Sequence, residues 1–153
     1  TNQRDVGGEP VADLIVRGAN LKGINIPEAL VPLAIDEFPV LFIAAACAEG
    51  KTTLTGAEEL RVKESDRIQV MADGLIILGI DAVATVDGIC IQGGSISGGA
   101  VQSHGDHRIA MAFSVASIRA TDIIKISDCV NVNTSFPSFV DLAISTGMKV
   151  KSL

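Results

Sequence analysis

The segment from Leu60 to Ile68, with the sequence LRVKESDRI, concentrates charged and hydroxyl side chains between two apolar stretches. Lys63 lies four residues and Glu64 three residues before Arg67, so a helix that begins here would project both cations and one carboxylate from its first turn. Backbone N–H groups and the dipole at a helix N-terminus favour bound anions. A carboxylate is out of place in a simple phosphate site, so the pattern indicates proton transfer beside a bound anion. A solvated helix start held by ion pairs is an equally open interpretation.

Charged residues also begin two strongly apolar segments. Asp36 precedes residues 39–48, and Asp106 and Arg108 precede residues 109–118. A desolvated charge is costly unless it is paired or faces a cleft. Equivalent helices in adjacent units would therefore bring these charges to one surface, together with the LRVKESDRI segment. The alternative is that each aspartate only caps its helix; acidic caps are common, which favours this alternative for Asp106 and leaves Asp36 open.

Histidine is the kind of side chain that can act as a general acid or base near neutral pH, so His107 is a candidate for that role, or only a hydrogen-bonding residue at a helix start. The chain has no nucleophile motif, no dinucleotide or P-loop fingerprint and no ligand spacing typical of a metal site. We therefore predict neither a cofactor nor a metal. Cys47, Cys90 and Cys129 are far apart among apolar neighbours, which indicates small core residues in a reducing cytoplasm.

The composition and net charge of the chain exclude several classes of function. The chain has 153 residues, of which 48% are apolar, and a net charge of −6 without a basic run. This charge argues against nucleic acid and anionic membrane surfaces as partners. No apolar run approaches the ~20 residues of a membrane span, and no signal peptide opens the chain, so we expect a cytoplasmic protein. Without an initiator Met, the chain is expected to be a piece of something longer.

Hydrophobic periodicity predicts a mixed α/β fold in which an element pattern recurs after about 70 residues. The first set comprises a strand over 11–16, a helix over 39–48 that is buried on every side, a strand over 52–55, an amphipathic helix over 68–78 and a hairpin over 82–91 around Asp87-Gly88. A loop over 93–105 follows it. The second set comprises a buried helix over 109–118, a strand over 123–126 and an outer helix over 139–146. We infer two repeat units, 11–92 and 93–153, in one incomplete domain whose buried helices are surrounded by short sheets and outer helices.

Three motifs in this order resemble a known family. They are Asp36-Glu37-Phe38-Pro39, residues 60–67 (LRVKESDR) and residues 105–111 (GDHRIAM). Together they resemble the C-terminal part of the 5-enolpyruvylshikimate-3-phosphate synthases (3-phosphoshikimate 1-carboxyvinyltransferases). The resemblance implies the enolpyruvyl transferase fold of repeated βαβαββ units. It also implies transfer of the carboxyvinyl group of phosphoenolpyruvate to the 5-hydroxyl of shikimate 3-phosphate, with release of phosphate, in the shikimate pathway of aromatic amino-acid biosynthesis.

The resemblance also implies roles for individual side chains. Asp36 would accept the proton of the attacking hydroxyl and contact the shikimate ring. Glu64 would protonate and deprotonate the phosphoenolpyruvate methylene. Lys63 would contact shikimate 3-phosphate, and Arg67 and Arg108 would hold phosphoenolpyruvate, which suits bidentate guanidinium recognition. The other domain of such an enzyme is missing, so we predict that this chain alone does not turn over.

The resemblance leaves some positions unassigned. It implies that His107 lies close to the reacting groups without a defined role. Some relatives carry a lysine shortly before the Phe136-Pro137 pair, where this chain has residues 133–135 (Asn-Thr-Ser, with Thr134 in the middle), and some carry an asparagine where this chain has Glu59. Two rival interpretations stay open: the related enolpyruvyl transferase that acts on UDP-N-acetylglucosamine, and a non-catalytic ligand-binding module.

Overall fold

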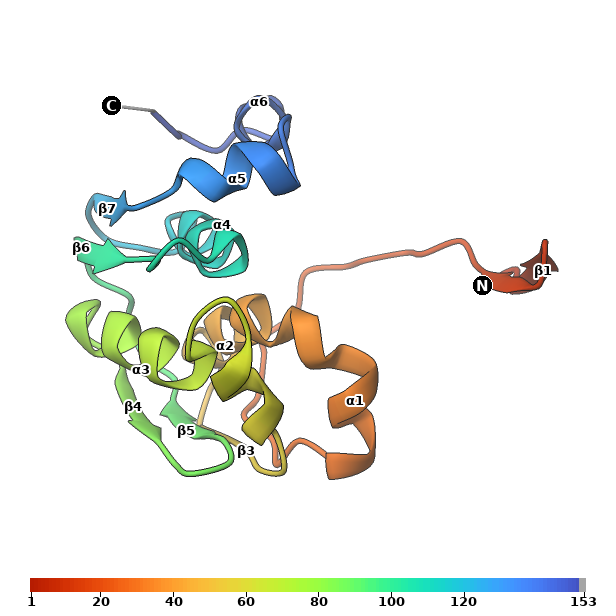
Figure 1. Cartoon of the computed structure of the whole chain (residues 1–153), viewed down its shortest axis with the longest axis horizontal. Coiled ribbons are helices and arrows are strands. Elements are labelled where there is room, and N and C mark those ends of the chain that lie inside the picture. The colour runs from red at the N-terminus through yellow and green to blue at the C-terminus, as the bar shows by residue number, and fades with distance from the viewer. Residues whose placement is uncertain (152–153) are drawn as a thin grey trace.

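The computed structural model describes residues 1–151, so the last two residues of the predicted unit 93–153 lie outside it. Short strands and helices alternate along the chain, which confirms the predicted mixture of both (Figure 1). The strands are β1 (Arg4–Val6), β2 (Glu9–Val11), β3 (Lys51–Leu54), β4 (Asp81–Ala84), β5 (Ile89–Gln92), β6 (Gly99–Gln102) and β7 (Ile124–Ser127). The α-helices are α1 (Val31–Ala34), α2 (Phe38–Ala46), α3 (Arg67–Ile77), α4 (His107–Ala116), α5 (Val130–Ser135) and α6 (Phe139–Ser145). Short 3₁₀ helices are η1 (Glu28–Leu30), η2 (Ile35–Glu37) and η3 (Glu58–Val62).

The strands form three small sheets. β1 and β2 make an antiparallel pair, β3, β5 and β4 make an antiparallel sheet in that order, and β6 and β7 pair in parallel. The predicted hairpin around Asp87-Gly88 is confirmed as β4 and β5. The prediction of a loop over 93–105 was wrong, because β6 lies inside it. Its small residues carry no strand signal, and its pairing partner β7 lies beyond α4, where sequence periodicity does not reach.

The predicted strand over 11–16 was also wrong. The chain leaves the β1–β2 hairpin at Val11, and residues 12–20 have no regular structure. Leu14 and Val16 are 86% and 89% exposed. The hairpin and the segment after it extend away from the rest of the molecule (Figure 1). An alternating apolar pattern forms a strand only where a neighbouring strand pairs with it; β1 pairs with Val11, but no strand among residues 1–151 pairs with residues 12–16.

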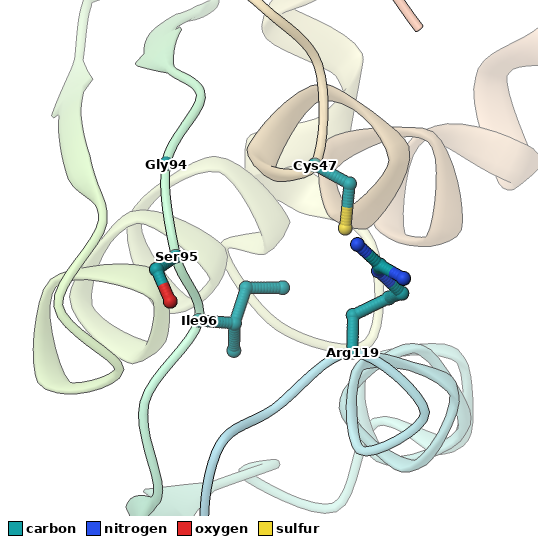
Figure 2. Close-up of a pocket in the computed structure, with 5 residues that line it drawn as sticks. All are labelled: Cys47, Gly94, Ser95, Ile96 and Arg119. Atoms are coloured by element: carbon teal, nitrogen blue, oxygen red, sulfur yellow. The ribbon is translucent and has the colours of Figure 1, made fainter. Parts of the chain in front are cut away.

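Helices α2 and α4 pack against each other and run in the same direction. At their first residues, Arg108 of α4 donates to the backbone carbonyl of Asp36 just before α2. At their other ends, Cys47 follows α2 and Arg119 follows α4, and both line one cavity of about 330 Å³ (Figure 2). The two helices therefore present their N-termini at the same end of the molecule.

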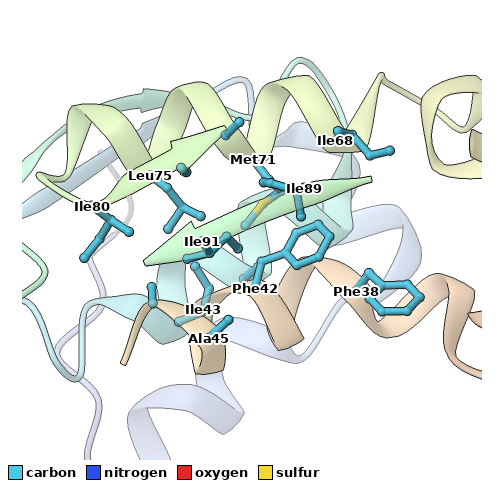
Figure 3. Packing of buried hydrophobic residues seen from close by; sticks show 14 of the residues in the cluster. Phe38, Phe42, Ile43, Ala45, Ile68, Met71, Leu75, Ile80, Ile89 and Ile91 are labelled. Atoms are coloured by element: carbon cyan, nitrogen blue, oxygen red, sulfur yellow. The ribbon is translucent and has the colours of Figure 1, made fainter. Parts of the chain in front are cut away.

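The core lies between α2, α3 and β5, whose apolar side chains meet in Figure 3. Phe38 and Phe42 of α2 stack with their ring centres 5.8 Å apart. The expectation that the helix over 39–48 is buried on every side was wrong in part, because Val40 and Leu41 are 38% and 41% exposed. Periodicity reports only that a face is apolar, whereas burial needs a second element to cover it.

The helical stretch from Glu28 to Ala46 bears on the prediction that no apolar run approaches the length of a membrane span. Within residues 1–151, this stretch of 19 residues is long and apolar enough to cross a bilayer by length and composition alone. The core helix of a soluble protein passes the same test, and the second half of this stretch is the core helix α2. Asp36 and Glu37 interrupt the stretch near its middle, in η2.

A substitution at Gly74 of α3 tests how closely α3 packs against α4. A Cβ atom added at Gly74 would overlap the ring of Phe113, which is fully buried in α4. We expect Gly74→Ala to lower the free energy of unfolding by a net of about 1–2 kcal/mol, because overpacking outweighs the helix propensity gained by alanine. Urea unfolding measures this change. Gly18→Ala is the matched control, since its added Cβ meets nothing within 4 Å. An unchanged or raised midpoint for Gly74→Ala would contradict the close α3–α4 contact.

Candidate functional site

The LRVKESDRI segment leads into helix α3, which begins at Arg67, within one residue of the predicted start at residue 68. Asp66 caps the helix, accepting a hydrogen bond of 3.0 Å at Oδ1 from the backbone N–H of Gln69, and Arg67 is the first helical residue. Lys63 and Glu64 therefore lie in the turn before the helix and not in its first turn. The reason is local, because an aspartate side chain satisfies a free N–H group at the helix start and fixes the boundary there.

The Arg67 side chain is the centre of the site. It is only 1% exposed, and each nitrogen of its guanidinium faces a carboxylate. Nε lies 2.8 Å from Asp106 Oδ2, Nη1 lies 3.0 Å from Asp36 Oδ1, and Nη2 lies 2.5 Å from Glu64 Oε2. A buried cation is tolerated only when an anion is paired with it and its N–H donors have hydrogen-bond acceptors. These three carboxylates supply both the negative charge and the acceptors.

Asp106 is the fully buried partner of Arg67. Its Oδ1 accepts a hydrogen bond of 2.9 Å from the backbone N–H of Arg108, so its predicted role as the cap of α4 is confirmed. Its Oδ2 also accepts a hydrogen bond of 3.1 Å from the Ser65 hydroxyl. The sequence analysis missed its pairing with Arg67, because an acidic helix cap gives no signal of a partner 39 residues earlier in the chain. Asp106 thus joins the start of α3 to the start of α4.

Arg108 joins α4 to the segment before α2. Its Nη1 lies 2.9 Å from the backbone carbonyl of Asp36 and 3.1 Å from Glu37 Oε1, while Nη2 lies 3.8 Å from Asp36 Oδ2. The Arg108 side chain is 31% exposed, unlike that of Arg67, so part of it is open to a ligand. The cation at the start of α4 therefore lies beside Asp36, as the sequence predicts, and also contacts Glu37, which had no predicted role.

Lys63 completes the group of cations. Its Nζ lies 2.5 Å from Glu59 Oε1 and 3.8 Å from Asp36 Oδ1. The hydrogen bond to Glu59 is the largest cause of a raised pKa for Lys63, with a further contribution from the negative charge of Asp36. Lys63 is therefore positively charged at neutral pH. Glu59 is thus the ion-pair partner of this lysine.

Asp36 is held ionised by the surrounding cations. Burial acts to raise its pKa, but the hydrogen bond from Arg67 and the charges of Arg108 and Lys63 outweigh burial, and the net effect lowers the pKa below 3.8. A proton acceptor must be ionised before the proton arrives. Asp36 meets this condition at neutral pH.

The structure brings five of the six predicted site residues into one network of ion pairs: Asp36, Lys63, Glu64, Arg67 and Arg108. His107 is next to this network in sequence, but its side chain makes no hydrogen bond or ion pair with the described residues. Thr134 is exposed in α5. Across residues 1–151, no three His, Cys, Asp or Glu side chains are grouped as metal ligands would be.

This arrangement combines two chemical capabilities. The starts of α2, α3 and α4 meet around Arg67, so three helix dipoles add to its positive charge and favour an anion there. The carboxylates of Asp36 and Glu64 are bound to two nitrogens of the same guanidinium, which holds two candidate proton-transfer groups next to that anion site.

The buried pair between Arg67 and Asp106 generates a stability prediction. Asp106→Asn keeps a side chain that caps helices well but removes the negative charge that faces Arg67. We expect the free energy of unfolding to fall by up to about 3 kcal/mol, because Arg67 keeps Asp36 and Glu64 as partners. Urea unfolding measures the change, with the exposed Asp141→Asn as the matched control. Equal stability of the two variants would show that the cap, and not the charge, is what matters at this position.

The lowered pKa of Asp36 generates a pH prediction. A carboxylate whose pKa is depressed on folding stabilises the fold above its unfolded pKa, and this contribution disappears as the pH falls from about that value through the lower folded pKa. For Asp36 the ordinary value is 3.8. We expect the stability of the parent chain to fall more steeply below this pH than that of Asp36→Asn, with Asp141→Asn behaving like the parent. Parallel curves for parent and Asp36→Asn would contradict the cationic surroundings of Asp36.

Comparison with known proteins agrees with this geometry. The family described as EPSP synthase (3-phosphoshikimate 1-carboxyvinyltransferase) matches residues 2–142. A protein named 3-phosphoshikimate 1-carboxyvinyltransferase from Methylococcus capsulatus is 68% identical over 148 residues, and one of the same name from Alkalilimnicola ehrlichii is 69% identical over 148 residues. These matches cover 97% and 96% of this chain.

The solved structure of an EPSP synthase from Acinetobacter baumannii matches the fold with a TM-score of 0.94 and 57% sequence identity, over 98% of this chain and 36% of that one. The predicted enolpyruvyl transferase fold is thereby confirmed. The chain spans about a third of the length of its relatives, with 34% of the Methylococcus protein and 33% of the Alkalilimnicola protein covered. The family match over most of the chain, the high identities and the shared fold show that this chain belongs to the EPSP synthase family.

Proposed function

We propose that this chain supplies one wall of the active site of an enzyme that transfers the carboxyvinyl group of phosphoenolpyruvate to the 5-hydroxyl of shikimate 3-phosphate and releases phosphate. Family membership supports the reaction. One observation supports the site: Asp36 and Glu64 are held on Nη1 and Nη2 of the single buried guanidinium of Arg67. Acid–base chemistry beside an anionic substrate needs this combination of carboxylates and cation.

In the proposed reaction the two carboxylates act on different protons. Asp36, which is ionised at neutral pH, accepts the proton of the 5-hydroxyl as its oxygen bonds to C2 of phosphoenolpyruvate. Glu64, which enters this step protonated, gives its proton to the methylene carbon C3 and becomes a carboxylate. It takes a proton back from the same carbon when the bond between C2 and the phosphate oxygen breaks and the double bond re-forms. The proton held on Asp36 passes to the departing phosphate, so both carboxyl groups return to their starting states. Glu64 is suited to exchange protons with a ligand because its side chain is 51% exposed.

The substrate anions would compete with carboxylates for the cations. Arg67 has all its nitrogens occupied, so a carboxylate or phosphate of phosphoenolpyruvate would replace Glu64 or Asp36 on the guanidinium edge. Arg108 would hold the same substrate from its open side. Lys63 would turn from Glu59, which is 60% exposed, toward shikimate 3-phosphate. Each exchange trades one charge-assisted hydrogen bond for another, so its net cost is small.

The rest of the proposed enzyme lies in the two thirds of the relatives' length that this chain does not span. That part would supply the opposite wall of the cleft and exclude water, so we predict that the chain alone does not turn over. We keep the division into repeat units 11–92 and 93–153 as part of this proposal, with two units contributed to one domain. The proposed compartment is the cytoplasm.

A hybrid enzyme tests the proposal. This chain replaces the matching 148 residues of the Methylococcus capsulatus relative, and phosphate release is measured with phosphoenolpyruvate and shikimate 3-phosphate. We expect the hybrid to be active. We expect Asp36→Asn and Glu64→Gln each to lower kcat by about 10²–10⁴-fold, the usual contribution of a general acid or base.

Glu58→Gln is the matched control, because Glu58 is an exposed carboxylate close to Lys63 in sequence whose side chain has no partner among the described residues. It should keep the activity of the hybrid. A folded hybrid without activity, or Asp36→Asn and Glu64→Gln variants as active as Glu58→Gln, would overturn the proposed roles.

A further inference from the structure

We propose that Arg61 is the positioning residue for Glu64, a role that rests on the proposed function. Arg61 contacts neither Arg67 nor Arg108, the two arginines proposed to hold phosphoenolpyruvate. Instead, its guanidinium ties the turn that carries Glu64 to a neighbouring hairpin and to the cap of helix α3. One side chain thus fixes both ends of this turn.

The three contacts of Arg61 diverge from one guanidinium. Nε donates to the backbone carbonyl of Val86 at 2.7 Å, Nη2 donates to the backbone carbonyl of Thr85, and Nη1 lies 2.5 Å from Asp66 Oδ2. The two carbonyls belong to the turn between β4 and β5, more than 20 residues along the chain. The side chain is 26% exposed, so most of it is shielded from water and its hydrogen bonds are worth more than those of a surface ion pair.

Asp66 links this anchor to the helix start. Its Oδ2 binds Arg61, while its Oδ1 accepts the backbone N–H of Gln69 and caps α3. Arg61 and Asp66 therefore close the residues between them into a side-chain-bridged turn, with Lys63 and Glu64 at its middle. The next residue along the chain, Arg67, holds the Glu64 carboxylate.

The β4–β5 turn is a firm support because it also holds the chain ahead of Arg61. The Asp87 carboxylate accepts the backbone N–H of Gly56 at 2.9 Å, and the Asp87 carbonyl accepts the backbone N–H of Ala57 at 2.7 Å. The segment from Gly56 to Asp66 is thus bound to the β4–β5 turn at two places: by the backbone N–H groups of Gly56 and Ala57, and by the side chain of Arg61. A shift of about 1 Å in a reacting group is enough to cost a large factor in rate, so this anchoring matters for chemistry.

The Arg61→Lys variant distinguishes the effect of the positive charge at this position from the effect of the three hydrogen bonds of the guanidinium. Arg61→Lys keeps the positive charge beside Asp66, but an ammonium group cannot reach three divergent acceptors. In the hybrid enzyme we expect Arg61→Lys to lower kcat by about tenfold. In the Glu64→Gln background the same change should leave kcat within about twofold, because a residue that acts through Glu64 has no effect once Glu64 is lost. Hydrogen exchange should become faster in residues 60–66 and stay unchanged in α4.

Arg119→Lys is the matched control, since the exposed Arg119 side chain makes no hydrogen bond or ion pair with the described residues. Arg119→Lys should change neither kcat nor the rate of hydrogen exchange in residues 60–66. An equal loss of kcat from Arg61→Lys in both backgrounds, or faster exchange throughout α3 and α4, would overturn the positioning role in favour of a general structural one. Full activity of Arg61→Lys would overturn it as well. If Glu64→Gln alone leaves kcat unchanged, the proposed function fails, and exchange in residues 60–66 decides separately whether Arg61 anchors the turn.

Discussion

The buried ion pair between Arg67 and Asp106 is the constraint on which the rest of this site depends. A guanidinium that is 1% exposed and a carboxylate that is fully buried are each costly alone and are stable only together. Arg67 begins α3 and Asp106 caps α4, so this requirement fixes the starts of two helices against each other. The remaining nitrogens of Arg67 extend the same requirement to Asp36 and Glu64. Folding and assembly of the site are therefore one process.

Burial divides the charged groups into two kinds. Arg67 and Asp106 are enclosed and hold the geometry, whereas Asp36, Glu64 and Glu59 have about half or more of their side chains exposed. An exposed carboxylate can leave a cation when a substrate anion arrives, and a buried pair cannot. This division suits a proposed enzyme that must hold a rigid centre while its outer groups exchange partners and protons.

Family membership and the local geometry support each other in different ways. The relatives establish the fold over almost the whole chain, but they say nothing of which contacts hold each side chain in place. The geometry supplies these contacts: Arg61 and Asp87 anchor the segment ahead of α3, and Asp106 anchors the first residue of α3. The exposed apolar faces at Leu14, Val40 and Leu41 belong to a chain that spans a third of the relatives' length.

The sequence by itself determined the motifs, the buried helices α2 and α4, the amphipathic α3, the β4–β5 hairpin and the acidic cap at Asp106, because each depends on neighbours within one or two helical turns. It also indicated that Asp36, Arg108 and the LRVKESDRI segment share a surface. Only the tertiary structure decided that Asp106 pairs with Arg67, that small residues form β6, and that residues 11–16 do not form a full strand. Those outcomes depend on partners tens of residues away, and local periodicity and propensity carry no information about which distant group becomes the partner.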